Sequence, residues 1–207
     1  MLSLVFSLLA CGADVTHDKP AAEVGTAAPA AAHPPTVAPP AARAPGLAVD
    51  KARSSVVATG AKVVGSHELN FGDFDGELGL EGENFVNVTA RVRTGSVTTD
   101  SEKLTQHLLT PDFFSATEFP EASFTSTLVT VGGASGGTHT VKGNLSLRGV
   151  SREISFPVTV EVTATEVSAR AELSINRADF GVIYPGKPDN LIKDEVSLRI
   201  HFVAARG

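Results

Sequence analysis

Strict alternation of apolar and polar residues is the feature that most limits what this chain can fold into. The alternation is clearest in five segments, which are residues 86–93, 141–148, 154–163, 167–176 and 196–202. Weaker alternation occurs in three more, residues 54–64, 71–81 and 123–131. A period of two places the apolar side chains of a strand on one face, which is typical of antiparallel sheets with one buried face. We therefore predict an all-β protein with about eight antiparallel strands.

One stretch between these segments follows a helical pattern instead. Residues 99–102 read TDSE, a capping-box sequence in which the threonine would cap the start of a helix. Leu104 and Leu108 then lie four residues apart, on one face of a helix, and Pro111 cannot continue it. The sequence predicts one short helix over residues 100–109, inserted between strands.

About eight amphipathic strands suit either a sandwich or a closed barrel. An outer-membrane barrel would carry aromatic girdles, and this chain has no Trp and one Tyr. We therefore expect the apolar faces to point inward, in a barrel whose interior is either filled by side chains or holds one slender ligand.

The N-terminus is of a different kind. Residues 1–10 form an apolar run of the length found in secretory signals, although no Lys or Arg precedes it. Cys11, the single cysteine, follows the tripeptide LLA, and this tetrapeptide resembles the lipobox of bacterial lipoproteins. We predict a signal peptide over residues 1–10 and lipidation of Cys11, with an ordinary signal peptide as the alternative.

The segment after Cys11 is rich in Ala and Pro and has no aromatic residue up to residue 46. Such a composition cannot bury enough apolar area to offset the entropy of ordering, so residues 11–46 are predicted to form a disordered tether. Residues 47–207 are predicted to form the β-barrel domain.

Charge and motif content argue against several functions. The chain has 17 basic and 23 acidic residues and no Lys/Arg-rich run, so we expect no nucleic-acid partner. One cysteine excludes a Cys-cluster metal site, and the histidines show no metal-ligand spacing. No GxSxG nucleophile elbow occurs. The sequence therefore predicts no cofactor, metal site or catalytic residue.

An enzyme on this barrel would have to use a small set of polar residues. The candidates are His107, Asp112 and the pair Arg177 and Asp179. We expect structural roles for them instead: a bond from His107 to a backbone carbonyl, and a salt bridge within the Arg177/Asp179 pair at the surface or the barrel rim. Contact with a ligand headgroup is the alternative for His107 and for this pair.

Several short strings occur together in a defined order. They are residues 96–100 (SVTTD), 104–108 (LTQHL), 112–114 (DFF), 119–120 (FP), 124–127 (FTST), 141–150 (VKGNLSLRGV) and 177–181 (RADFG). In this order and spacing they resemble the YceI-like family of periplasmic polyisoprenoid-binding proteins, over about residues 46–205. The resemblance implies an extended, lipocalin-like barrel with an inserted helix and an interior that holds an isoprenoid chain.

An isoprenoid tail has no hydrogen-bonding groups, so it needs a long, dry channel lined by apolar side chains. The candidate lining residues come from the inward strand faces, with two phenylalanines that could cap the channel. They are Phe74, Val88, Val92, Phe113, Phe114, Leu145, Leu147, Phe156, Val158, Phe180 and Phe202. Ordinary core packing is the alternative for each of them.

Together these observations predict non-catalytic binding of a long isoprenoid or related lipid, including a quinone, inside the barrel. The protein would be displayed from a membrane through acylated Cys11, on the periplasmic face of a bacterial cell envelope. A stress-related enzyme, or a protein-interaction module on a filled barrel, is the alternative, and a homodimer is left open.

Overall fold

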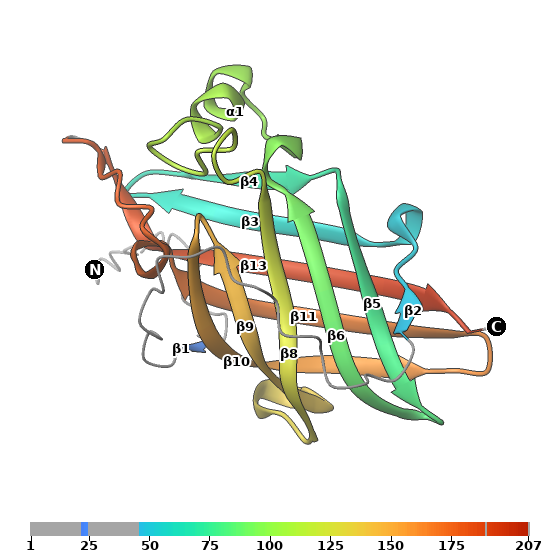
Figure 1. Cartoon of the computed structure of the whole chain (residues 1–207). Helices are drawn as coiled ribbons and strands as arrows, with labels where there is room; N and C mark the ends of the chain where they lie inside the picture. Colours follow the sequence, from blue (N-terminus) through green and yellow to red (C-terminus); the bar gives the residue numbers. More distant parts are fainter. Residues whose placement is uncertain (1–21, 25–45, 189, 207) are drawn as a thin grey trace, which may run out of the picture.

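The computed structural model describes residues 22–24, 46–188 and 190–206, which form one strongly curled antiparallel sheet (Figure 1). The predicted signal peptide, Cys11 and most of the predicted tether lie outside the described residues. The strands are β1 (Glu23–Val24), β2 (Gly46–Ala48), β3 (Ser55–Lys62), β4 (Ser66–Phe71), β5 (Phe74–Glu81), β6 (Asn84–Arg93), β7 (Val97–Thr98), β8 (Glu121–Val131), β9 (His139–Leu147), β10 (Val150–Val162), β11 (Glu166–Asn176), β12 (Gly186–Lys187) and β13 (Asn190–Ala205). One α-helix, α1 (Glu102–Leu108), and four short 3₁₀ turns, η1 (Lys51–Arg53), η2 (Thr94–Ser96), η3 (Ala134–Gly136) and η4 (Arg177–Phe180), complete the described fold.

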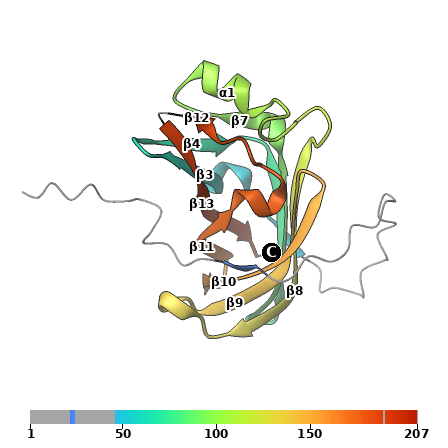
Figure 2. The ribbon, with the colours of Figure 1, turned by 90° about the vertical axis from the view of Figure 1, so that its left-hand side faces the viewer.

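The order of the strands explains the curled shape. Hydrogen-bonded neighbours follow the path β2-β5-β6-β8-β9-β10-β11-β13-β3-β4-β7, and each of the pairs is antiparallel. A single bridge between Val49 and Ala204 brings the β2 end of the path back to β13. Register shifts between β5 and β6, β8 and β9, and β13 and β3 bend the sheet further, because a bulge increases the local twist. The result is the predicted all-β, lipocalin-like barrel (Figure 2).

The five strongly alternating segments correspond to β6, β9, β10, β11 and β13, as predicted. The three weaker segments contain β3, β5 and β8, but the prediction missed β4 as a strand of its own. Its sequence SHELNF has a histidine at one of its inward positions, so the alternation of apolar and polar residues covers only its last four residues. The helix is two residues shorter at its start than predicted, and its cap is Ser101, whose Oγ accepts a hydrogen bond from the Leu104 amide, rather than the threonine at 99.

The core lies between the two halves of the curled sheet. Its most deeply buried side chains include Leu78, Val141, Val167, Leu173 and Phe180. A second cluster joins α1 to the sheet, and it consists of Ala58, Leu69, Val97, Leu108, Phe113 and Val182. Because α1 buries Leu108 there, the helix covers the open side of the barrel beside β4 (Figure 1). No helix among the described residues has the length and apolar character needed to cross a bilayer.

The barrel wall splits between β10 and β11. These strands pair only where Thr159–Val162 of β10 meets Val167–Arg170 of β11, and beyond that point β10 continues with β9 and β11 with β13. The short strand β1 lies at this split: it pairs with β10 at Ile154 and Ser155, and the Ala22 amide donates to the Ser174 carbonyl of β11 at 2.9 Å. Residues 22–24 belong to the segment predicted as a disordered tether. They pair with the sheet here, because free strand edges offer hydrogen-bond partners to a passing segment.

Candidate functional site

The curled sheet encloses a cavity of about 220 Å³ beneath α1. Its wall is built from the inward side chains of β3, β4, β6, β8, β9, β11 and β13, with Leu104 and Leu108 of α1 on the open side. Alternation explains this wall directly, because every second residue of each strand points to the same face. By comparison, an apolar protein cavity of about 150 Å³ stays dry and accepts benzene. The volume here is therefore large enough for an apolar ligand.

A second cavity of about 80 Å³ lies deeper, between β6, β9, β10, β11 and β13. The two cavities share part of their walls, and the shared residues are Ala90, Phe124, Leu145, Leu198, Ile200 and Phe202. The two spaces therefore follow one another along the barrel interior, separated by apolar side chains. Gly143 leaves space for the Phe124 ring, because a Cβ atom at Gly143 would lie 2.6 Å from that ring.

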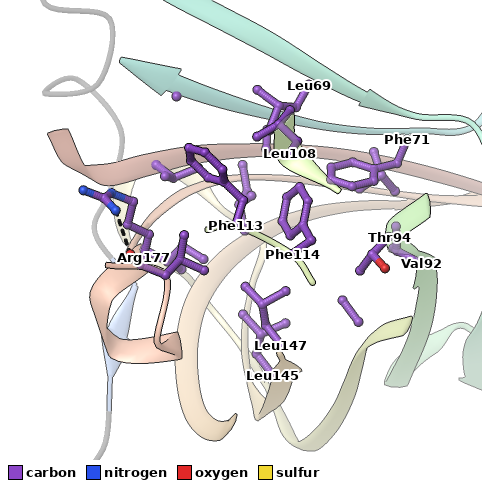
Figure 3. A pocket seen from close by; sticks show the side chains of 18 of the residues that line it. Leu69, Phe71, Val92, Thr94, Leu108, Phe113, Phe114, Leu145, Leu147 and Arg177 are labelled. Carbon is purple, nitrogen blue, oxygen red and sulfur yellow. Dashed lines mark hydrogen bonds between the residues drawn. The ribbon is translucent and has the colours of Figure 1, made fainter. Parts of the chain in front are cut away.

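Aromatic rings form the covered side of the larger cavity. Figure 3 shows Phe113 and Phe114 between Leu108 on one side and Leu145 on the other. The Phe114 ring contacts Phe71 edge-on, with ring centroids 5.8 Å apart. These rings reach the cavity from the segment after α1, whereas most of the wall comes from the sheet.

Polar groups are confined to a few places on the cavity wall. Thr94 is buried, and its hydroxyl donates to the Phe119 carbonyl at 2.8 Å, so it presents no unsatisfied donor to a ligand. Lys62 and His67 lie at the end formed by the β3–β4 hairpin, with 3.4 Å between Lys62 Nζ and His67 Nε2. His67 Nδ1 lies 2.9 Å from the exposed carboxylate of Asp100. Because these side chains are partly exposed, this end of the cavity reaches the surface.

Arg177 is the buried charge of the site, and its position corrects the predicted rim salt bridge with Asp179. Its residue is only 6% exposed, and its guanidinium donates to the carbonyls of Val182, Ile192 and Lys193 at 2.7, 3.3 and 3.1 Å. Its acidic partner is Asp194, at 2.9 Å. Alternation does not apply here, because residues 177–180 form the turn η4 rather than a strand. The guanidinium therefore joins the segment after η4 to the start of β13 at the cavity end.

Nine of the eleven predicted lining residues come together around the two cavities. Val92, Phe113, Phe114 and Leu147 line the larger cavity, Val88, Phe156 and Val158 line the smaller one, and Leu145 and Phe202 line both. Phe74 and Phe180 do not line either cavity. Phe74 stacks on Phe202 with ring centroids 5.9 Å apart, and Phe180 is fully buried in η4.

Sequence reasoning missed much of the wall beside β3, β4 and β13. The lining residues there include Val56, Leu69, Phe71, Ile192, Val196 and Leu198. The alternation of residues 196–202 already placed Val196 and Leu198 on the inward face, so that signal could have found them. Leu69 and Phe71 alternate with Glu68 and Asn70, so the same signal could have found them, but the run is only four residues long because His67 interrupts the apolar face.

Of the candidate catalytic groups, His107 and Asp112 lie outside the walls of the two cavities, whereas Arg177 lines the larger one. His107 bonds Asp112 rather than the predicted backbone carbonyl, with 2.8 Å between Nε2 and Oδ2, and its ring packs edge-on against Phe113 and Tyr184. His201 lies on the outer face of β13, where burial and the nearby Arg170 lower its pKa. No group of three or more His, Cys, Asp or Glu side chains within residues 22–24, 46–188 and 190–206 could hold a metal ion.

A curled antiparallel sheet around an elongated apolar interior defines a lipocalin-like barrel. The model of the YceI-like domain matches residues 47–204, and the chain belongs to this family. A UPF0312 protein of Yersinia enterocolitica is 38% identical over 98 residues, which are 46% of this chain and 47% of that protein. The match thus spans about half the length of this relative.

Solved structures share the fold. BcnA of Burkholderia cenocepacia aligns with a TM-score of 0.66 and 24% identity, over 75% of this chain and 99% of that one. A polyisoprenoid binding domain from Saccharophagus degradans, implicated in plant cell wall breakdown, aligns with a TM-score of 0.62 and 16% identity, over 78% of this chain and 99% of that one. At these identities the likeness concerns the fold.

Proposed function

We propose that this protein binds a long isoprenoid or a related lipid, such as a quinone, in the barrel interior without catalysing a reaction. The observation that carries the proposal is the pair of consecutive apolar cavities, whose walls offer a hydrocarbon chain contact along its length. Two buried polar groups of the wall, Thr94 and Arg177, are engaged with protein partners. The polyisoprenoid binding domain with the same fold supports this ligand class.

The enzyme alternative receives less support from the site. His107 and Asp112 are paired, but neither side chain lines a cavity, and the Arg177 guanidinium is occupied by carbonyls and Asp194. A protein-interaction module whose barrel is filled by side chains would not contain the cavity beneath α1. Dimer formation is not needed to complete the cavity, because a single chain supplies the described wall.

Extraction of the purified protein tests the proposal. We expect an organic extract of the natively expressed protein to contain a polyprenyl lipid or a polyprenyl quinone by mass spectrometry. We also expect delipidated protein to bind a fluorescent polyprenyl analogue saturably, because the empty apolar cavity favours hydrocarbon over water. An extract without lipid, together with no saturable binding, would contradict the proposal.

We further propose that the barrel is tethered to a membrane of the bacterial cell envelope, on the periplasmic face, through acylated Cys11. The support is the tripeptide LLA before the single cysteine and the Ala/Pro-rich segment behind it. Cys11→Ser removes the acylation site and is expected to move the protein from the membrane fraction to the soluble fraction. Several acyl chains hold a protein firmly on a membrane, whereas one chain gives only marginal binding. The measurement is fractionation with intact-mass analysis, and a wild-type protein that is soluble and unacylated would refute the anchor.

A further inference from the structure

Four large apolar side chains are exposed at the end of the barrel where the cavity reaches the surface. Val63 and Val64, in the β3–β4 turn, are 68% and 77% exposed. Ile183, after η4, is 73% exposed, and Leu191, at the start of β13, is 49% exposed. We call these four side chains the apolar rim. Exposed apolar groups gathered at one place mark a contact surface more often than single exposed residues do.

The segments that carry the apolar rim are joined to one another by backbone contacts. The Val63 amide donates to the Leu191 carbonyl at 3.1 Å, and Leu191 pairs with Gly186 of β12. Ile183 belongs to the segment that leads from η4 into β12. The rim is therefore a surface formed by the β3–β4 and β12–β13 ends, at the end of the barrel that faces the viewer in Figure 2.

The apolar rim is continuous with the cavity wall. Each of its segments has a neighbouring residue that lines the larger cavity: Lys62 precedes the β3–β4 turn, Val182 precedes Ile183, and Ile192 follows Leu191. Alternate residues on an extended backbone point to opposite sides, so the same three segments present one side chain to the cavity and the next to solvent. A hydrocarbon chain that leaves the cavity here would meet apolar side chains up to the surface.

The charges beside the apolar rim fit a phospholipid headgroup layer. Lys62 and the exposed Lys187 place amines next to the apolar side chains. Two carboxylates among the described residues of this region have basic partners: Asp100 lies 2.9 Å from His67, and Asp194 lies 2.9 Å from Arg177. Apolar side chains flanked by amines on long stems suit the boundary between acyl chains and phosphates.

We propose that the apolar rim docks onto a phospholipid bilayer, so that the ligand passes between bilayer and cavity without crossing water. This inference rests on the proposed lipid-binding function. It adds a place and a direction to that function: Val63, Val64, Ile183 and Leu191 enter the acyl layer, and Lys62 and Lys187 lie among the phosphates. A charged residue in the rim would therefore hinder exchange with membranes while leaving the cavity wall intact.

The test uses the full chain carrying Cys11→Ser, in which the natural anchor and the natural thiol are absent. Val64→Cys, Ile183→Cys and Val131→Cys are each labelled with an environment-sensitive nitrobenzoxadiazole dye and mixed with vesicles of phosphatidylethanolamine and phosphatidylglycerol. Val131 is the matched control, since it is an apolar side chain that is 87% exposed at the end of β8, away from the rim (Figure 1). We expect the dye signal to rise at positions 64 and 183 and to stay unchanged at 131.

A second measurement separates docking from ligand binding. The double variant Val63→Asp/Val64→Asp is expected to bind a fluorescent polyprenyl analogue as tightly as the parent. We expect it to exchange the analogue with vesicles about tenfold more slowly, because a loss of about 1.4 kcal/mol of apolar contact lowers the docking equilibrium constant by that factor. No dye response at position 64, an equal response at 131, or a dimer that the double variant dissociates would overturn bilayer docking. Failure of the parent to bind the analogue would instead contradict the proposed function, while the dye signals would still decide whether the rim enters the bilayer.

Discussion

Leu145→Arg is expected to weaken binding of a fluorescent polyprenyl analogue by about 100-fold or more, because an unpaired guanidinium in an apolar interior excludes hydrocarbon and draws in water. Leu145 is the sharpest position for this test, since it lines both cavities and stands opposite Phe124 on the neighbouring strand. Binding would be measured by fluorescence titration of delipidated protein, and folding by thermal melting.

Asn144→Arg is the matched control. Asn144 is the residue before Leu145 on β9, and it is exposed. The control variant therefore places the same arginine side chain on the outer face of the strand. We expect its affinity and melting temperature to stay close to wild type, because exposed substitutions change stability by less than about 0.5 kcal/mol. Arg148, which alternation alone places on the outer face, is unsuitable: it has a φ of 52° in the β9–β10 turn, and its guanidinium donates to the Phe113 carbonyl at 2.7 Å.

The two variants separate a ligand channel from a filled core. Loss of binding by Leu145→Arg with a retained melting transition supports the channel. Unfolding of Leu145→Arg, with no lipid found in wild type, would favour ordinary core packing. Equal binding by wild type and Leu145→Arg would place the ligand elsewhere and remove the interior from the mechanism.

Arg177→Met is expected to lower the free energy of unfolding by about 3 kcal/mol, because buried acceptors that lose a charged donor are left without compensation. The guanidinium donates to the carbonyls of Val182, Ile192 and Lys193, and these residues belong to the segment beside the cavity end. For a domain of this size, we expect a fall in melting temperature of roughly 6–12 °C, since each kcal/mol shifts it by about 2–4 °C. Urea unfolding with an unchanged slope would show that native stability is what changed.

Asp194→Asn isolates the ion pair from the carbonyl contacts. The Asp194 side chain is 61% exposed, so solvent screens its attraction to Arg177, and we expect a loss below about 1 kcal/mol. If Asp194→Asn destabilised the protein as much as Arg177→Met, the ion pair rather than the three carbonyls would hold the segment. A wild-type melting temperature for Arg177→Met would refute the structural role altogether.

The lining prediction shows how far a period of two reaches. Val88, Val92, Leu145, Phe156 and Val158 line a cavity because a regular strand keeps every second side chain on one face. The rule fails at Val86 on β6, which alternation groups with Val88. The register passes from Asn87 opposite Gly79 to Phe85 opposite Leu80, so Val86 is the extra residue of a bulge and Phe85 takes the inward place in the smaller cavity.

The alternation of the sequence by itself determined the all-β class, the main strands and the inward face of most of them, because side-chain direction along a strand depends only on local backbone geometry. Tertiary structure alone decided the features that join distant segments. These are the inclusion of β4 in the wall, the burial of Arg177 among three carbonyls, and the gathering of Val63, Ile183 and Leu191 at one end of the cavity. Each depends on which strands become neighbours, and strand pairing is set by hydrogen bonds and packing between residues that lie far apart in the chain.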